Sequence, residues 1–300
     1  MTKTEVIDLH FTGDFSLAGS VALAASAAFV DNIRPLEGST SASALDLAFP
    51  VEGNWSTVGV RVVEREGELR ATLFANPDKV PAIRIRTQLE RMLSLDTDGA
   101  DYKAVCSRDK VVSELVGRNP GIRPVLFPSP YEAAARAIIG HGLAVRQAAA
   151  LHGRLATEHG VAVEVGNRMM HGFPAPDRLA VLPPTRGLAD RKIEQLRALG
   201  SAAADGFLDS ASLLAMTRDE VTQHLLQLAG IGPFSAELIL IRGMGDPDAF
   251  PREEKRLQQA MAVAYDLGDS PDLDMLERIA DNWRPYRSWV GLLLRNFRRI

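Results

Sequence analysis

A short glycine-rich segment between two helix-forming stretches is the clearest candidate for a binding site in this sequence. Residues 228–236 read Leu-Ala-Gly-Ile-Gly-Pro-Phe-Ser-Ala. Gly230 and Gly232 supply the backbone freedom that a tight turn between helices requires. Such a turn leaves main-chain N–H groups at the start of the second helix without intrahelical partners, and Ser235 can add a hydroxyl beside them. The segment therefore predicts an anion-binding site.

The flanking residues predict a helix-hairpin-helix unit over residues 221–242. Leu225 and Leu228 fall at helical spacing after Thr217, which is placed to cap the first helix. Residues 236–242 are typical of the start of an apolar second helix. Without further features the turn would be purely structural, because two glycines between helices most often mark only a helix end.

A loop closed by Pro251 brings Glu253 and Glu254 to the start of a third predicted helix. The whole unit resembles the helix-hairpin-helix DNA glycosylases. The resemblance is to the 3-methyladenine DNA glycosylase II branch, which repairs alkylated DNA and in which an Asp-x-Phe-Pro loop precedes a catalytic aspartate. Asp248, Phe250 and Pro251 match that loop. Glu254 stands where the family has its aspartate.

Further motifs extend the resemblance over residues 127–289. Residues 127–133, Phe-Pro-Ser-Pro-Tyr-Glu-Ala, are similar to the family's Pro-Phe/Tyr-Glu helix start. Residues 283–289, Trp-Arg-Pro-Tyr-Arg-Ser-Trp, are similar to the signature that closes the family's helical core. In the segment similar to the helix that leads into the hairpin, we expect Arg191 and Lys192 to form a solvated cationic face.

The resemblance assigns the reaction to Glu254. An N-glycosylase extrudes a damaged base and uses a carboxylate to stabilise positive charge that develops on the sugar. Glutamate reaches about 1 Å further than aspartate, and such a misplacement costs on the order of a hundredfold in rate. The alternative is a solvated carboxylate or one placed at a helix N-terminus, where the helix dipole favours it. Asp248 is expected only to cap or hydrogen-bond within its loop.

The family also inserts a bulky wedge into the hole that the extruded nucleotide leaves. His141 and Gly142 occupy the corresponding turn, and Leu143 is the nearest apolar residue. His141 is a candidate to contact the orphaned base, although a lone histidine is more often structural. The residues expected to stack on the damaged base are aromatic, namely Tyr131, Phe234 and Trp289.

The resemblance also implies how the hairpin would hold DNA. A sodium-like cation, bridging to a phosphate, would be bound by the carbonyls of Leu226, Leu228 and Ile231. Carbonyl ligation suits a hard cation and excludes zinc. The phosphate would be approached by the amides of Gly230, Gly232 and Phe234. Bifunctional members carry a lysine where Phe234 stands, and a phenyl ring cannot form an imine with the sugar.

The amino-acid composition limits the classes of protein and of site that these motifs can represent. The 300 residues are 46% hydrophobic, as in globular proteins, and the formal net charge of −4 means that DNA contact requires a local basic face. A single cysteine, Cys106, excludes an internal disulfide and cysteine metal sites. Residues 17–30 are apolar but are preceded by acids, so we expect a buried helix of a cytoplasmic protein and no membrane association. No cofactor is expected to be required, and the protein is expected to be a monomer that binds damaged double-stranded DNA.

The chain is predicted to be mainly α-helical with a small N-terminal α+β domain. Residues 58–63 and 68–74 are strand-like and separated by Glu66-Gly67, which predicts a hairpin within an N-terminal domain of residues 1–85. Residues 86–300 show helical periodicity broken by Pro and Gly and are expected to form an all-helical glycosylase-like core.

Two functions from different classes remain open. The first is a monofunctional DNA N-glycosylase of base excision repair that hydrolyses alkylated bases from DNA, with water as nucleophile. The second is a catalytically weak or inactive lesion-binding protein that retains the hairpin anchor. The departures at Glu254 and at His141-Gly142 separate them.

Overall fold

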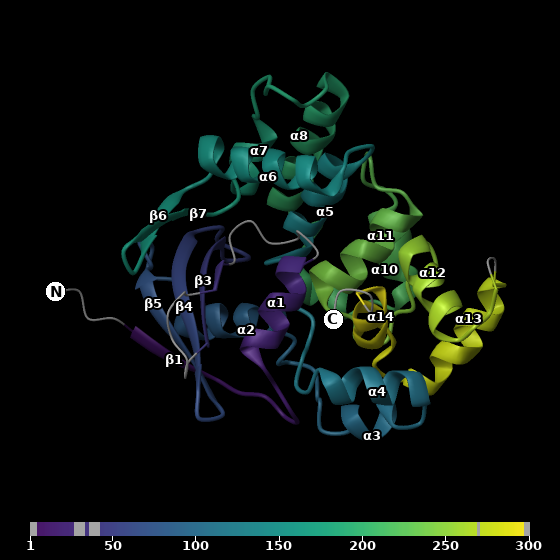
Figure 1. Cartoon of the computed structure of the whole chain (residues 1–300). Coiled ribbons are helices and arrows are strands. Elements are labelled where there is room, and N and C mark those ends of the chain that lie inside the picture. The colour runs from purple at the N-terminus through teal and green to yellow at the C-terminus, as the bar shows by residue number, and fades with distance from the viewer. Residues whose placement is uncertain (1–4, 27–33, 36–42, 269–270, 297–300) are drawn as a thin grey trace.

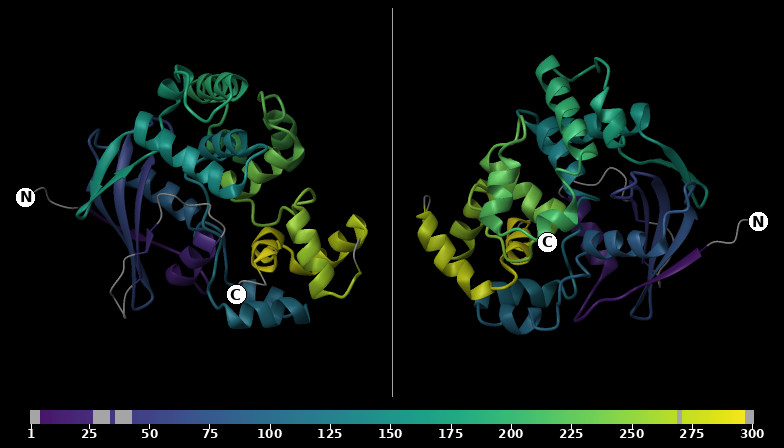
Figure 2. Two further views of the ribbon diagram at one scale, coloured as in Figure 1. Left: turned by 45° about the horizontal axis from the view of Figure 1, so that its top comes forward. Right: turned by 180° about the vertical axis from the view of Figure 1, so that it is seen from behind.

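The computed structural model describes residues 5–26, 34–35, 43–268 and 271–296. An antiparallel sheet lies on one side of the molecule, and helices occupy the other side and the top (Figure 1). The same division is visible from behind in Figure 2. The predicted fold class, mainly helical with a small N-terminal sheet, is confirmed. Within the described ranges, no helix is long and apolar enough to cross a membrane.

The N-terminal sheet has five strands in the order β1-β5-β4-β3-β2. They are β1 (Glu5–Leu9), β2 (Arg34–Pro35), β3 (Ser43–Pro50), β4 (Thr57–Arg65) and β5 (Glu68–Ala75). The predicted hairpin is β4–β5, in which Arg65 pairs with Glu68. Its turn residues Glu66 and Gly67 have φ of 55° and 79°, the left-handed values that a two-residue hairpin turn requires.

Two helices pack on one face of the sheet. They are α1 (Leu17–Ser26) and α2 (Ala82–Met92), and Leu17, Ile85 and Leu89 share one buried core with the strands. The buried helix predicted for residues 17–30 is confirmed as far as Ser26, and the rest lies outside the described residues. Helix α2 runs across the boundary predicted after residue 85. The division of the chain into two domains stays a prediction.

The expectation of an all-helical region after residue 86 is wrong in one place. Strands β6 (Ala162–Val165) and β7 (Arg168–His171) form a hairpin that packs on the N-terminal sheet, where Val163 and Val165 contact Ala48. A Cβ at Gly59 would lie 2.9 Å from a methyl group of Val165, so this glycine permits the close approach. The strands are only four residues long, too short for their alternation to stand out from the surrounding helical periodicity.

The remaining described helices contribute to two further buried clusters. The first contains residues of α5 (Pro130–Gly140), α6 (Val145–His159), α7 (Pro176–Ala180), α8 (Asp190–Ala204), α9 (Ser210–Leu214), α10 (Arg218–Leu225), α11 (Pro233–Ile239) and the π-helix η1 (Leu240–Met244). The second contains residues of α3 (Tyr102–Cys106), α4 (Lys110–Arg118), α12 (Lys255–Ala264), α13 (Leu273–Ala280), the 3₁₀ helix η2 (Asp281–Trp283) and α14 (Arg287–Arg295). The candidate site lies where the two clusters face each other.

Candidate functional site

The predicted hairpin joins α10 to α11. Thr217 begins α10 with a capping box, because its amide donates to the Glu220 carboxylate (2.8 Å) and its hydroxyl accepts from the Glu220 amide (3.4 Å). The buried side chains of Val221 and Leu225 then face the first cluster, as their spacing predicts. Helix α11 continues directly into η1, so one long helical segment leads from the turn to the acidic loop.

The two glycines of the turn have different structural roles. Gly230 has a φ of 89°, and a Cβ there would lie 2.7 Å from the side chain of Gln195. Gly232 has an extended backbone, and a Cβ there would meet nothing within 4 Å. Gly230 is therefore required by the fold, whereas the backbone at Gly232 is open to a ligand from outside.

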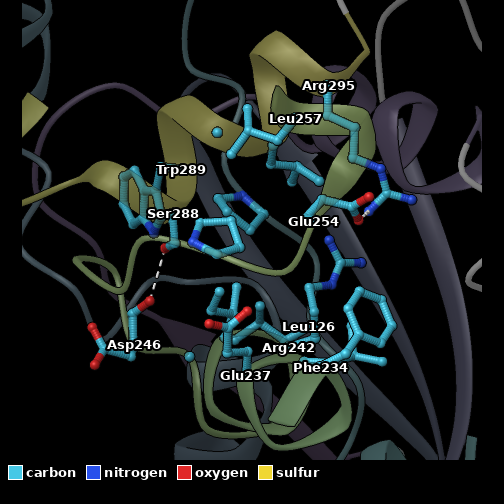
Figure 3. Close-up of a pocket in the computed structure, with 17 residues that line it drawn as sticks. Leu126, Phe234, Glu237, Arg242, Asp246, Glu254, Leu257, Ser288, Trp289 and Arg295 are labelled. Atoms are coloured by element: carbon cyan, nitrogen blue, oxygen red, sulfur yellow. Dashed lines mark hydrogen bonds and ion pairs between the residues drawn. The ribbon is translucent and has the colours of Figure 1, made fainter. Parts of the chain in front are cut away.

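A cleft of about 390 Å³ lies between the hairpin and the second cluster. Its walls include the turn 140–143, Phe234 and Ser235 at the start of α11, and Glu254. The structure thus brings together the predicted catalytic carboxylate, the predicted wedge turn and part of the predicted hairpin anchor. A smaller inner pocket of about 60 Å³ shares Phe234 and Glu254 and is drawn in Figure 3.

Glu254 is the N-cap residue of α12, and its side chain is held from two directions. One carboxylate oxygen accepts from the amide of Arg256 (3.2 Å), and the other lies 3.1 Å from Nη1 of Arg295 at the end of α14. The ion pair with Arg295 is visible in Figure 3. The carboxylate side chain is 17% exposed, so Glu254 lines the cleft and is not a freely solvated surface residue.

The wedge turn is fixed to the first cluster by a lysine. Nζ of Lys192 donates to the carbonyls of Ile139 and His141, both at 2.7 Å. The expectation that Lys192 belongs to a solvated cationic face is therefore wrong, because its ammonium satisfies the last carbonyls of α5. His141 itself is exposed, Gly142 has a φ of 69°, and Leu143 is half-buried beside the cleft.

The three aromatic residues predicted to stack on a base lie in different surroundings. Phe234 is 47% exposed and lines both the cleft and the inner pocket. Trp289 is 2% exposed and packs against Tyr102, with ring centroids 5.2 Å apart, but it also lines the inner pocket. Tyr131 is fully buried in the first cluster, where its hydroxyl donates to the carbonyl of Pro174 (2.8 Å). Tyr131 lines neither space, so we do not retain it in the candidate base pocket.

Arginines contribute more to the cleft than the sequence patterns indicated. Arg136 of α5 and Arg295 of α14 line it, with side chains 11% and 15% exposed. Arg136 and the buried Arg242 lie 5.0 and 5.7 Å from the ring centroid of Phe127. Burial, together with the charges of Arg295 and Arg136, lowers the pKa of Arg242 to about 9. Five arginines and no acidic residue lie between Trp283 and Ile300, and this was the only sequence signal for Arg295.

A second carboxylate that the patterns did not single out lines the inner pocket together with Glu254. Glu237 of α11 lines the inner pocket and accepts a hydrogen bond from the amide of Glu253 (3.1 Å). Burial raises the pKa of Glu237 above its ordinary value. In the sequence, Glu237 is marked only by its position one turn after Phe234. The sequence alone gave no reason to select it.

The loop residue Asp248 is structural. It accepts from Nη1 of Arg284 (2.8 Å) and from Nε of Arg287 (3.0 Å), and it is buried. These arginines belong to the segment 283–289, so the two motifs are partners. Their contact fixes the acidic loop against the start of α14.

The carbonyls proposed for a cation lie on the turn before α11. That of Leu228 accepts from the amide of Ile231 (3.1 Å), which leaves its second lone pair for a ligand. Across the described part of the chain, no group of three His, Cys, Asp or Glu side chains could hold a metal ion. The carbonyl oxygens of the turn are the groups there that could hold a cation, and oxygen ligands suit a hard cation.

Solved structures of other proteins share the fold of this chain. No model of a known protein family matches the chain. The 3-methyladenine DNA glycosylase of Archaeoglobus fulgidus has a TM-score of 0.80 to this chain, with 20% identity, and covers 99% of this chain and 98% of its own. The chain has the helix-hairpin-helix DNA glycosylase fold. The predicted resemblance is thereby confirmed at the level of structure.

Sequence comparison identifies relatives of this glycosylase-fold chain. A probable bifunctional transcriptional activator/DNA repair enzyme AlkA of Mycobacterium tuberculosis is 33% identical over 205 residues, 67% of this chain and 40% of that protein. DNA-3-methyladenine glycosylase 2 of Escherichia coli is 27% identical over 241 residues, 75% of this chain and 81% of that protein. The chain thus matches less than half of the Mycobacterium protein, and its homologues include DNA-3-methyladenine glycosylases, as the motifs indicated.

Proposed function

We propose that this chain is a monofunctional DNA N-glycosylase that hydrolyses the bond between a damaged base, alkylated bases included, and its deoxyribose. One observation carries the proposal. A carboxylate, an exposed aromatic ring, the hairpin and the wedge turn all line one cleft, contributed by Glu254, Phe234, Ser235 and residues 140–143. These are the parts that excision of an extruded base requires.

The hairpin would hold the DNA backbone. Main-chain groups near Gly232 would approach a phosphate, and the carbonyls of Leu226, Leu228 and Ile231 would bind a sodium-like cation that bridges to it. Such contacts position the duplex without reading its sequence. The turn at His141 would then face the gap left by the extruded nucleotide, with Leu143 as its apolar member.

Glu254 would act on the extruded nucleotide. Its negative charge stabilises the positive charge that develops on the sugar as the glycosidic bond lengthens, and water completes the hydrolysis. The contacts with Arg256 and Arg295 fix the orientation of the carboxylate. Phe234 would stack on the base, because it lines the cleft and nearly half of its surface is exposed.

The test of the reaction is substitution of Glu254. We expect Glu254→Gln to reduce single-turnover excision from alkylated duplex DNA by at least a hundredfold while DNA affinity stays within about threefold, because the charge acts only in the transition state. Glu254→Asp should retain or raise the rate. The matched control is Glu253→Gln, since Glu253 is exposed and lines neither space. Equal activity of the Glu254→Gln variant and the wild type would remove Glu254 from the reaction.

The monofunctional assignment has its own test. Phe234 offers no amine, and Lys255 is exposed on α12 outside both the cleft and the inner pocket. We expect excision to leave an intact abasic strand and borohydride to trap no covalent complex. A trapped complex that disappears in Lys255→Met would show instead that the chain is a lyase.

The second candidate is a lesion-binding protein with little excision activity. The observation that favours it is the ion pair of Glu254 with Arg295, which places a positive charge 3.1 Å from the proposed catalytic carboxylate. The same series decides between the two functions. If the wild type binds damaged duplex but releases no base, and Glu254→Asp releases none, the binding function replaces the enzymatic one.

A further inference from the structure

The cleft is lined by more positive than negative side chains. Among the described residues that line it, one is a carboxylate, Glu254, and three are arginines, Arg136, Arg256 and Arg295. His152 also lines it, and burial lowers its pKa to about 4, so it is uncharged at neutral pH. The side chains that line the cleft therefore sum to a positive charge, and the carboxylate of Glu132, which contacts Arg136, lies behind this lining.

Two of these arginines are withdrawn from the surface. The side chains of Arg136 and Arg295 are 11% and 15% exposed, whereas Arg256 is exposed. Arg136 lies 3.4 Å from the buried Glu132, and Arg295 lies 3.1 Å from Glu254. Groups at this depth are badly placed for the DNA backbone, which would run over the surface past the hairpin. They are well placed to contact a base that enters the cleft.

The charge of the base decides whether such a wall helps or hinders excision. A purine methylated at N3 or N7 is a cation, which the arginines repel, and it leaves the sugar as a neutral molecule. An uncharged damaged base leaves with the electron pair of the broken bond on its nitrogen, so negative charge develops on it. Arginine stabilises such charge by charge-assisted hydrogen bonds.

Building on the proposed glycosylase function, we propose that the cleft selects uncharged damaged bases over cationic N-alkylated bases, with Arg295 and Arg136 stabilising the departing base. In this reaction the bond between C1′ and the base nitrogen breaks, and its electron pair goes to the base. Water then forms a bond to C1′, and the proton that it loses neutralises the base. Cyclic adducts such as ethenoadenine are uncharged alkylation products and belong to the favoured class.

Arg295 is the residue to test, with three variants of the full chain. Arg295→Met removes the charge, Arg295→Lys keeps it, and Arg252→Met is the matched control. Arg252 is also an ion-paired arginine close to Glu254, 2.7 Å from Glu277, but it lines neither the cleft nor the inner pocket. Equal midpoints of urea unfolding would show that the variants are folded.

The measurement is single-turnover release of ethenoadenine or 7-methylguanine from otherwise identical duplexes, each expressed as a multiple of its uncatalysed loss. We expect the wild type to accelerate release of ethenoadenine more than that of 7-methylguanine. Arg295→Met should lower the ethenoadenine acceleration at least tenfold and leave or raise that of 7-methylguanine. Arg295→Lys should keep the wild-type preference, and Arg252→Met should change neither.

Two contrary results have different meanings. A wild type that favours 7-methylguanine, or an Arg295→Met variant that slows both releases equally, would overturn the selection of uncharged bases and leave the glycosylase function in place. Release of neither base by the folded wild type would overturn the glycosylase function, and the proposed selectivity with it.

Discussion

At the level of single residues, a buried acid and base beneath the cleft couple its stability to pH. Nε2 of His152 lies 3.2 Å from the Glu132 carboxylate, and the ring of His152 stacks on Phe173 with centroids 4.5 Å apart. Burial and, to a smaller extent, the nearby charge of Arg136 lower the pKa of His152 to about 4, against the opposing effect of Glu132. Both side chains are almost fully buried, so their protonation changes the free energy of unfolding.

The sign of this coupling follows from proton binding. Between about pH 6.5 and about pH 4 the unfolded chain protonates His152 and the folded chain does not, so stability falls as pH falls. Above about pH 6.5 His152 is neutral in both states and has no effect on stability, whereas at about pH 5.5 its protonation in the unfolded chain lowers the free energy of unfolding by about 1 kcal/mol. The lowered pKa of Glu132 acts in the same direction at lower pH.

We expect His152→Gln to weaken this pH dependence, because glutamine can still donate to Glu132 but does not titrate. The free energies of unfolding by urea at about pH 7.5 and about pH 5.5 should differ by about 1 kcal/mol less in the variant than in the wild type. His159→Gln, at a half-buried position on the same helix, is the control. An unchanged pH dependence in His152→Gln would assign it to other groups.

At the level of elements, the hairpin contains two glycines that lie two residues apart. We expect substitution of one to weaken DNA binding and substitution of the other to lower stability. At Gly232 a Cβ meets nothing within 4 Å and the backbone is extended, so Gly232→Val should fold normally. Its branched side chain would block the close approach of a phosphate. We expect the affinity for duplex DNA to fall at least tenfold, equally for damaged and undamaged sequences, because phosphate contacts carry no base information.

Gly230→Val is the matched comparison. Its φ of 89° disfavours any branched residue, and its Cβ would lie 2.7 Å from Gln195. This variant should lose stability, seen as a lower unfolding temperature, before any effect on DNA is considered. Fluorescence anisotropy at moderate salt and thermal unfolding separate the two cases. Unchanged affinity of folded Gly232→Val would remove the hairpin from the DNA interface.

Helices α5 and α8 are linked by a lysine that holds the wedge turn. Lys192→Met should remove two hydrogen bonds to the carbonyls of Ile139 and His141 and lower stability by about 1–2 kcal/mol. Excision should fall more than DNA affinity, because the turn loses its position beside the cleft. Arg191→Met, at an exposed position on the same helix, should leave both stability and excision unchanged. Equal behaviour of the two variants would contradict this role of Lys192.

At the level of the whole molecule, Asp248 joins segments that are distant in sequence. It accepts from Arg287 at the start of α14 and from Arg284, and Arg218 of α10 lies 3.7 Å away. Arg218 also pairs with Asp246 in the same loop. These contacts connect the first and second clusters on either side of the cleft. The geometry of the site therefore depends on an ion-pair network outside it.

We expect Asp248→Asn to destabilise the protein by on the order of 3 kcal/mol, because the buried guanidinium of Arg287 would lose its closer carboxylate partner at 3.0 Å and keep only Asp281 at 3.6 Å. Asp281→Asn is the matched control. Asp281 lies 2.9 Å from the same Arg284, but its side chain is 55% exposed, so its loss should cost less than about 1 kcal/mol. Urea unfolding measures both. A similar cost for the two substitutions would show that the network at Asp248 is not a structural connection.

The features that the sequence determined are those in which neighbouring residues decide the conformation. Glu66-Gly67 made the β4–β5 turn, and Thr217 with Glu220 capped α10. The hairpin at Gly230 followed from the need for a positive φ between two helices. In each case backbone sterics and hydrogen bonds within a few residues dominate, and these interactions can be read in chain order.

Contacts between distant segments were decided only by the tertiary structure. In the sequence Arg295 was only one of five arginines after Trp283, and packing of the two clusters turned it toward Glu254. In the sequence, Tyr131 and Phe234 were both aromatic candidates for the base pocket. In the structure Tyr131 is buried in the core, whereas Phe234 is exposed in the cleft. Lys192 found its carbonyl partners more than fifty residues away. Periodicity shows which residues share a face of a helix, whereas the face that meets another helix is set by the summed packing of many side chains.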